Sequence, residues 1–255
     1  MLSHVFRSGL FTVAAVSMFV LPSDIAAEVY ELRTYTTNEG KLDNLNNRFR
    51  DHTIRLFDKH GMESVGYWVP TAEPASQNTL IYVLKHASRD AATASWNAFG
   101  NDPEWRKIAK DSQVDGRILA KAPTSLFMTA ADYSPVFKSA ASDAHTVFEL
   151  RVYRTHQNKL QNLDARFSDH TISLFNRYRM QSVAYWHPIE KPESSDTLIY
   201  IIRHASRDTA TASWKAFLAD EEWKTVAKQS QLDGTILREP PESTFIKATD
   251  YSAIQ

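Results

Sequence analysis

The sequence repeats itself at an offset of 118 residues, and this repeat constrains the fold more than any other feature. Residues 29–134 (repeat 1) align with residues 147–252 (repeat 2) without a gap, and about 60 of the 106 aligned positions are identical. The segment Asp51–Ile54 (DHTI) returns in this way as Asp169–Ile172. The chain therefore contains two copies of one unit, and residues kept in both copies can be compared with residues that changed.

This repeat predicts the domain organisation. A length of 255 residues accommodates two units of about 105 to 110 residues, each large enough for its own hydrophobic core. We predict one domain at residues 28–134 and a second at residues 146–255. Proline and small residues predict a linker at residues 135–145.

Residues 1–27 have the pattern of a secretory signal peptide. His4 and Arg7 precede an apolar run from Leu10 to Leu21, and small residues end the segment at Ala27. The apolar run is short for a membrane span, and no later segment approaches 18 apolar residues, so we expect no transmembrane segment in the mature chain. We predict a secreted or periplasmic protein. The alternative is a mitochondrial protein, because the first 23 residues contain no acid.

Composition and motifs exclude several classes of function. The net charge is −1 with acidic and basic residues interleaved, which argues against a nucleic-acid partner. Without cysteine the chain has no disulfides and no thiol nucleophile. It has no glycine-rich phosphate loop and no GxSxG motif. No HxH, HExxH or carboxylate cluster has the spacing of metal ligands, so we predict no metal site.

The order of elements within each repeat predicts the fold class. In repeat 1 the periodicity predicts a strand at 29–35, a helix at 40–60, strands at 62–70 and 79–86, helices after Ser88 and Asp102, and an extended segment at 117–130. Strand, helix, strand, strand, helix, strand is the ferredoxin-like order. We predict an α+β fold in which two fused ferredoxin-like domains form an intramolecular, pseudo-dimeric α/β barrel.

The first strand of each repeat carries a polar face that both copies keep. This face consists of Glu31, Arg33 and Tyr35 in repeat 1 and of Glu149, Arg151 and Tyr153 in repeat 2. We expect these residues to line the barrel interior and treat them as candidate ligand-binding residues. Two interpretations stay open: Arg33 binds a ligand carboxylate with Glu31 tuning it, or the charges form a buried network that joins the two halves.

Two histidines of repeat 1 survive in repeat 2: His52 recurs as His170, and His86 recurs as His204. His52 falls on the apolar stripe of the predicted helix, so we expect it to be buried. As a catalytic candidate it would exchange protons or bind a ligand. The alternative is a structural histidine bonded to a backbone or carboxylate group.

Asp51, with its counterpart Asp169, is a further catalytic candidate. It is placed to orient the neighbouring histidine, and to pair with Arg48 or Arg55 on the same helix. His86 lies at the end of a predicted strand, where it binds a ligand or, as we favour, caps the next helix or stays solvated. The six tryptophans read as core anchors.

Several segments, in order, resemble the NIPSNAP family: YELRTY and FELRVY, RFRDHTIRLF and RFSDHTISLF, SVGYW and SVAYW, NTLIYVLKHASRDAATASWNAF, and NDPEWRKIAKDSQVDG. The resemblance covers both repeats. It implies the fold of the dimeric α/β-barrel superfamily, which includes small monooxygenases and haem-handling enzymes, with the dimer made within one chain. Animal members are associated with mitochondria and with vesicle or autophagy partners, but an exported tandem protein departs from that setting.

Two functions remain open from the sequence. We predict an exported protein that binds an unidentified small molecule or protein, without a cofactor. The alternative is a cofactor-independent or haem-linked oxygenase-type enzyme that uses His52 or His170 in a pocket of each domain. Further homo-oligomers are compatible with either function.

Overall fold

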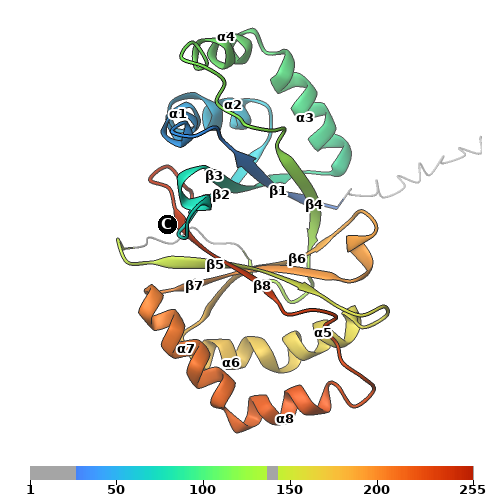
Figure 1. Cartoon of the computed structure of the whole chain (residues 1–255). Coiled ribbons are helices and arrows are strands. Elements are labelled where there is room, and N and C mark those ends of the chain that lie inside the picture. Colours follow the sequence, from blue (N-terminus) through green and yellow to red (C-terminus); the bar gives the residue numbers. More distant parts are fainter. Residues whose placement is uncertain (1–26, 137–142, 255) are drawn as a thin grey trace, which may run out of the picture.

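The computed structural model describes residues 27–136 and 143–254. The predicted signal peptide, except for its last residue, lies outside the described residues, as does the centre of the predicted linker. Figure 1 shows the strands between two layers of helices, with the helices of repeat 1 above and those of repeat 2 below.

The two repeats have the same elements in the same order. Repeat 1 comprises β1 (Val29–Thr36), α1 (Leu42–Arg48), α2 (Ile54–Lys59), β2 (Glu63–Pro70), β3 (Thr79–His86), α3 (Arg89–Asn101), α4 (Pro103–Asp111) and β4 (Thr124–Ala130). Repeat 2 comprises β5 (Val147–Arg154), α5 (Leu160–Arg166), α6 (Ile172–Arg177), β6 (Gln181–Pro188), β7 (Thr197–His204), α7 (Arg207–Ala219), α8 (Glu221–Gln229) and β8 (Glu242–Ala248). Short 3₁₀ helices lie at Ala75–Gln77 and Glu193–Ser195.

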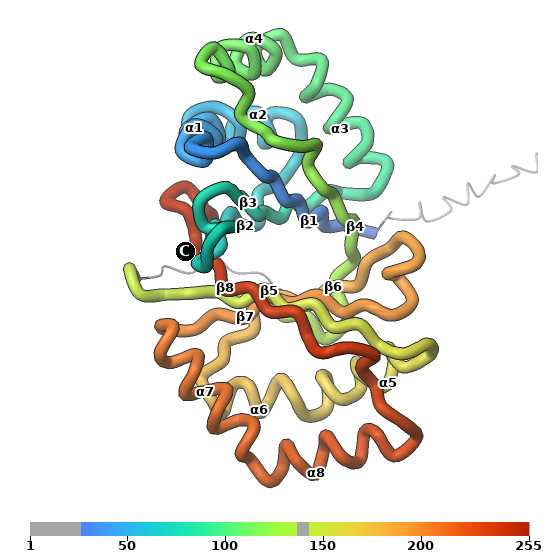
Figure 2. Tube along the Cα trace, viewed as in Figure 1, coloured from blue at the N-terminus to red at the C-terminus, as the bar shows by residue number. Residues whose placement is uncertain are grey.

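The strands close into one antiparallel barrel in the order β1-β3-β2-β8-β5-β7-β6-β4, which confirms the predicted fold. The last strand of each repeat joins the two sheets: β4 pairs with β1 and with β6, and β8 pairs with β5 and with β2. In Figure 2 the C-terminal segment runs from the sheet of repeat 2 to the side of β2. Each described strand of the barrel therefore has two neighbours and no free edge.

Apolar side chains cluster in the barrel interior. Trp68 and Trp186 are fully buried there, and Tyr30 and Leu32 of β1 pack against the same cluster. The prediction that Glu31, Arg33 and Tyr35 line this interior is therefore wrong. Because side chains alternate along a strand, these residues lie on the outer face of the sheet, beneath the helices, and Tyr35 belongs to the core between sheet and helices.

The predicted helix at 40–60 is interrupted by a π-helical turn at Phe49–Thr53, between α1 and α2. The hydroxyl of Thr53 donates to the carbonyl of Arg48, five residues earlier, at 3.0 Å. A π turn adds one residue to a helical turn and so shifts the stripe that faces the core. Thr53 is therefore buried and His52 is exposed.

Repeat 2 has the same π-helical turn at Phe167–Thr171, and His170 is exposed there as well. The predicted burial of His52 and His170 is therefore wrong. The helices predicted after Ser88 and Asp102 begin there, and both residues cap them: the side chain of Ser88 accepts from the Ala91 N–H at 3.0 Å, and that of Asp102 from the Glu104 N–H at 2.8 Å. In the described part of the chain, no helix has the length and apolar character needed to cross a membrane.

Candidate functional site

A pocket of about 470 Å³ lies in repeat 2 between the outer face of the sheet and the helices. Its lining consists of Arg151, Tyr153, Arg166, Phe167, Thr171, Phe175, Trp214, Phe217, Leu218, Trp223, Ala227, Gln231, Leu237 and Pro241. Aromatic and aliphatic side chains dominate this lining, and two arginines provide its charge. Its volume and composition are those of a site for a small organic molecule.

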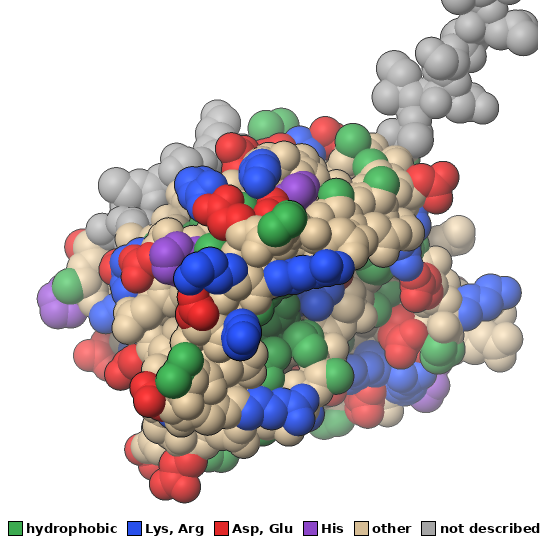
Figure 3. Space-filling view, turned by 90° about the horizontal axis from the view of Figure 1, so that it is seen from above, with side chains coloured by type: hydrophobic (Ala, Val, Ile, Leu, Met, Phe, Trp, Pro, Cys, Tyr) green, Lys and Arg blue, Asp and Glu red, His purple; other side chains and the backbone are tan. Residues whose placement is uncertain are grey.

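Repeat 1 carries the same side chains at the corresponding positions, with one exception. Shifting the fourteen lining positions by 118 gives thirteen identical residues, and the exception is Gly100 in place of Leu218. The repeats as a whole agree at about 60 of 106 positions, so the lining is kept more strictly than the rest of the unit. Figure 3, viewed from the side of the repeat 1 helices, shows a hollow that contains hydrophobic side chains and has Lys and Arg side chains around it.

One wall of the repeat 2 pocket is supported by the buried carboxylate of Glu149, on β5. This carboxylate accepts hydrogen bonds from four side chains: Arg151 Nη1 at 2.5 Å, Ser243 Oγ at 2.5 Å, Trp214 Nε1 at 2.7 Å and His204 Nε2 at 3.2 Å. These donors come from β5, β8, α7 and β7, so the carboxylate ties the sheet to the helix above it.

The hydrogen bonds decide the charge of Glu149. Burial by itself raises the pKa of this carboxyl, but the hydrogen bond from His204, the charge of Arg151 and the bonds from Ser243 and Trp214 outweigh it and bring the pKa to about 2. Glu149 is therefore ionised. Because an ionised carboxylate only accepts, the shared proton lies on His204 Nε2, and Nδ1 of this buried histidine has no partner.

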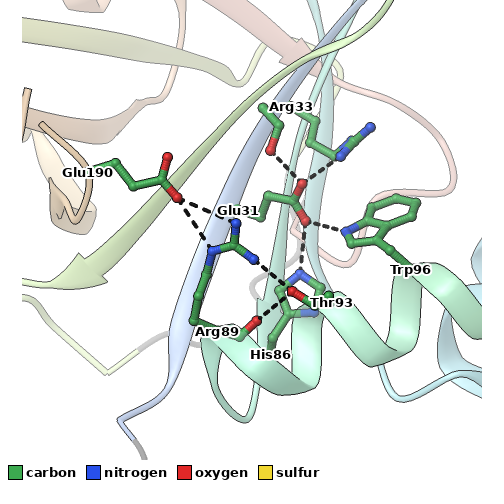
Figure 4. Close-up of polar contacts among 8 residues, drawn as sticks. Glu31, Arg33, His86, Arg89, Thr93, Trp96 and Glu190 are labelled. Carbon is green, nitrogen blue, oxygen red and sulfur yellow. Dashed lines mark hydrogen bonds and ion pairs between the residues drawn. The ribbon is translucent and has the colours of Figure 1, made fainter.

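Glu31 on β1 has the same surroundings in repeat 1, as Figure 4 shows. Its donors are Arg33 Nη1 at 2.5 Å, Ser125 Oγ at 2.6 Å, Trp96 Nε1 at 2.7 Å and His86 Nε2 at 3.0 Å. Its pKa is also about 2, because the same kinds of hydrogen bond and the charge of Arg33 outweigh its burial. All these partners belong to repeat 1, so the prediction that the network joins the two halves is wrong.

A different charge pair connects the repeats at this place. Figure 4 shows Arg89, at the start of α3, directed toward Glu190 of repeat 2, and the two side chains lie 3.4 Å apart. Both are largely exposed, and such pairs contribute little to stability. The network around Glu31 therefore connects the sheet and helix of repeat 1 only.

Glu149 holds Arg151 in place at the pocket wall. The guanidinium stacks over the Trp214 ring, 4.4 Å from its centroid, and donates to the hydroxyl of Tyr153 at 3.3 Å. Its Nε–H is buried and has no acceptor. The side chain is only 13% exposed, so it lies deep in the pocket.

Arg166, at the end of α5, is the second arginine of the pocket, and its charge is not balanced. It is 7% exposed, its Nη1 lies 3.5 Å from Ser230 Oγ, and its guanidinium lies 5.4 Å from the centroid of Trp223. Its buried Nε–H has no acceptor, and no carboxylate of the described residues forms an ion pair with it. Burial accordingly lowers the pKa of Arg166, and nearby Tyr153 offsets this only in part.

A family comparison covers both repeats. The NIPSNAP family model matches residues 30–135 and residues 148–253. The chain belongs to the NIPSNAP family. This confirms the resemblance seen in the sequence motifs, and both NIPSNAP repeats contain the carboxylate network and the two pocket arginines.

Solved structures match this chain at low sequence identity. A protein of Fusobacterium nucleatum titled "Putative monooxygenase" is 10% identical, with 88% of this chain and 93% of that chain covered and a TM-score of 0.58. An "anthrone oxidase-like protein" is 13% identical, with 89% and 93% covered and a TM-score of 0.55. A NIPSNAP family protein of Agrobacterium tumefaciens is 21% identical, with 43% and 98% covered and a TM-score of 0.37. Comparison with curated proteins gave no match.

The predicted catalytic candidates lie outside the pocket of the NIPSNAP repeat. His52 and Asp51 line a surface groove of about 390 Å³ beside α4, and His170 and Asp169 line its counterpart of about 280 Å³ beside α8. The histidine and its neighbouring aspartate therefore stand on the outer side of the π-helical turn, in a groove that also reaches Arg48 in repeat 1 and Arg166 in repeat 2.

The predicted pairing of Asp51 with Arg48 or Arg55 is wrong. Arg48 turns inward, where its Nη1 lies 3.3 Å from Ser112 Oγ, and Arg55 pairs with Glu104. Their places are set by α4, which packs beside the π-helical turn. Asp51 itself is exposed and holds neither arginine.

His86 and His204 also differ from expectation. Neither caps a helix nor reaches solvent, because both side chains are completely buried against the glutamate of their own repeat. They are not part of the pocket lining. Their hydrogen bonds stabilise the ionised glutamate, which in turn positions Arg33 or Arg151.

Arg48 and Arg166 were not predicted as site residues, and Trp96 and Trp214 were expected mainly as core anchors. One signal could have found the arginines, since both repeats keep them beside a buried phenylalanine. Within residues 27–136 and 143–254, no group of three or more His, Asp or Glu side chains could hold a metal ion.

Proposed function

We propose that this NIPSNAP protein binds a small organic molecule in the pocket between helices and sheet, one in each repeat. The observation that carries the proposal is the aromatic pocket of about 470 Å³ in repeat 2, whose lining recurs at all but one position in repeat 1. The barrel interior holds a buried apolar cluster and a cavity of about 310 Å³ beside Tyr30 and Trp186, whereas the larger space between helices and sheet lies beside buried arginines.

The signal-like segment at residues 1–27 supports export as part of the proposal. A small-molecule binding protein in the periplasm or outside the cell would meet its ligand without a transport step. Mass spectrometry of the mature protein from the secreted or periplasmic fraction tests this, with Glu28 expected as the first residue. An uncleaved chain in the cytosol or in mitochondria would contradict it.

An oxygenase-type enzyme is the alternative, and two similar folds carry titles that name oxidative chemistry. At 10% and 13% identity this likeness shows the fold alone. The pocket lining contains no histidine and no carboxylate, and His52 and His170 lie outside it. The lining offers no imidazole to ligate haem. Binding therefore has the better support.

A pocket-filling pair of substitutions tests the proposal. Ala227 on α8 lines the repeat 2 pocket, and Ala109 on α4 is its counterpart, so Ala227→Phe and Ala109→Phe place a ring into the space without changing any charge. The probe is 1-anilinonaphthalene-8-sulfonate, an aromatic anion whose fluorescence rises in apolar surroundings. We expect about two bound probes per wild-type chain, about one in each single variant, and none in the double variant.

Matched surface substitutions control for the added ring. Lys228→Phe and Lys110→Phe put the same side chain on the exposed side of the same two helices. They are expected to leave probe binding unchanged. Unchanged binding in the folded double variant, checked by thermal unfolding, would overturn the proposed pocket function.

A further inference from the structure

We infer that the pocket takes an organic monoanion, a carboxylate carried on an apolar body, with Arg166 as its anchor in repeat 2 and Arg48 as its anchor in repeat 1. This inference rests on the proposed function and names the class of its ligand. It is carried by the charges, the burial and the shape of the pocket.

The pocket of repeat 2 carries one uncompensated positive charge. Arg151 and Arg166 supply two guanidinium groups, and the ionised Glu149 behind Arg151 supplies one carboxylate. No acidic residue belongs to the lining. One further negative charge would neutralise the pocket, and a bound monoanion supplies it.

This anion would form an ion pair with Arg166. A buried cation without a counter-ion is costly, and proteins normally pair such groups. Here the nearest polar partner is the hydroxyl of Ser230, 3.5 Å from Nη1, and the buried Nε–H has no acceptor. A guanidinium with free N–H groups binds a carboxylate with two parallel hydrogen bonds, which is the strongest neutralisation available to it.

The exposed fractions of the lining residues indicate how a ligand would be oriented in the pocket. Arg166 and Arg151 are 7% and 13% exposed, whereas Leu218 at the edge of the lining is 58% exposed. The charged end therefore lies deep, and aromatic rings such as Phe175 and Trp223 lie around the space beside it. A ligand that fits has a carboxylate head and an apolar body that extends toward the opening.

Repeat 1 reproduces the anchor in detail. Arg48 is as buried as Arg166, its guanidinium lies 5.4 Å from the centroid of Trp105, and its Nε–H has no acceptor. Burial lowers its pKa as well. In this repeat Arg33 takes the place of Arg151, stacked 4.2 Å from the centroid of Trp96. Each chain therefore offers two sites for the same head group.

The test compares a carboxylate with a neutral molecule of the same body. Octanoate and 1-octanol are titrated by calorimetry into the full mature chain and into the double variant Arg48→Met, Arg166→Met, in which a straight apolar side chain replaces each arginine. We expect wild type to bind octanoate at two sites per chain and to bind it at least tenfold more tightly than octanol. The double variant should lose this preference and keep its affinity for octanol.

Stability of the ligand-free protein provides a second readout. Removing a buried, unpaired cation should raise the unfolding temperature of the Arg48→Met, Arg166→Met variant above that of wild type, even though it abolishes carboxylate binding. A merely structural role for these arginines would lower the unfolding temperature instead. The variants Arg48→Gln and Arg166→Gln, which keep a polar end group, repeat the titration if the methionine pair does not fold.

The outcomes separate this inference from the proposed function. If wild type and the arginine variants bind octanoate equally, or if octanol binds as tightly as octanoate, the assignment of a monoanion is overturned while the pocket remains a binding site. If neither molecule binds and the ring substitutions at Ala109 and Ala227 leave probe binding unchanged, the pocket function itself is overturned, and the inference with it.

Discussion

The two repeats differ more from each other on the inner face of the barrel sheet than on its outer face. On the inner face, counterparts such as Val83 and Ile201, or Met128 and Ile246, differ between the repeats, although all are buried and apolar. On the outer face, the pocket lining differs only where Gly100 stands for Leu218. An apolar interior needs only apolar groups of about the right volume. On the outer face the identities of the residues are kept as well.

The polar groups of the outer face reinforce this difference. Apolar residues beneath the helices would be sufficient for folding, since buried ion pairs are seldom more stabilising than well-packed hydrophobic groups. Both repeats nevertheless keep a glutamate with four donors and two arginines in this layer. Each glutamate network holds one of these arginines, and in repeat 2 both arginines line the pocket.

Acid should weaken the outer layer more than the barrel interior, and this is the largest effect we expect. The carboxyls of Glu31 and Glu149 have a pKa of about 2 in the folded chain against an ordinary value of 4.5. Because the folded value is the lower one, their stabilisation is complete above pH 4.5 and is lost as the pH falls toward 2. Each contributes on the order of 3 kcal/mol. Urea unfolding between pH 7 and pH 2.5 measures this loss.

The double variant Glu31→Gln, Glu149→Gln serves as the control for that titration. It leaves Arg33 and Arg151 without their carboxylate partners, so we expect it to be several kcal/mol less stable than wild type at pH 7. Its stability should then change much less between pH 4.5 and pH 2.5. A wild-type chain whose stability stays level across this range would show that these networks contribute little.

Exchanges between the repeats should be tolerated in the barrel interior. Val83→Ile and Met128→Ile give repeat 1 the residues that repeat 2 has at Ile201 and Ile246. We expect a change of less than about 1.5 kcal/mol in the free energy of unfolding, because volume and apolar character are nearly kept. Chemical unfolding measures it, and probe binding should not change. A larger loss would mean that the interior, too, depends on particular residues.

The one position that differs in the lining should change ligand preference with little effect on stability. Leu218 is 58% exposed, so Leu218→Ala should alter the free energy of unfolding by about 0.5 kcal/mol or less. It should open the repeat 2 pocket and raise the affinity for 2-naphthoate relative to benzoate several-fold. Gly100→Leu should lower the same ratio in repeat 1, where a Cβ at Gly100 would meet open space. Equal ratios in all variants would place this residue outside the ligand path.

Much of the fold could be predicted from the sequence, because the repeat and the element order leave few alternatives. The alternation of Glu31, Leu32 and Arg33 also separated the two faces of β1 correctly. It could not say which face meets the helices, since that depends on how β4 and β8 close the barrel between strands distant in sequence.

The candidate site was harder to predict for local and long-range reasons. A pattern of 3.6 residues placed His52 inward, but one π-helical turn displaced it. The residue that the turn brings inward, Thr53, is polar, so the apolar pattern did not reveal the turn. Arg48 looked like a surface partner of Asp51. Its actual surroundings, Trp105 and Ser112, come from α4 and the residues just after it, and only the folded chain brings them together.

Because the last strand of each repeat also pairs with the other repeat, the barrel can close only after both repeats have been synthesised. The sheet of repeat 1 is completed by β8, where Thr71 meets Phe245 across 174 residues of sequence. Just beyond β8, Ser252 accepts a hydrogen bond from the N–H of Tyr67. The four strands of repeat 1 can therefore pair with one another during synthesis, but the outer edge of β2 stays open until β8 has been synthesised.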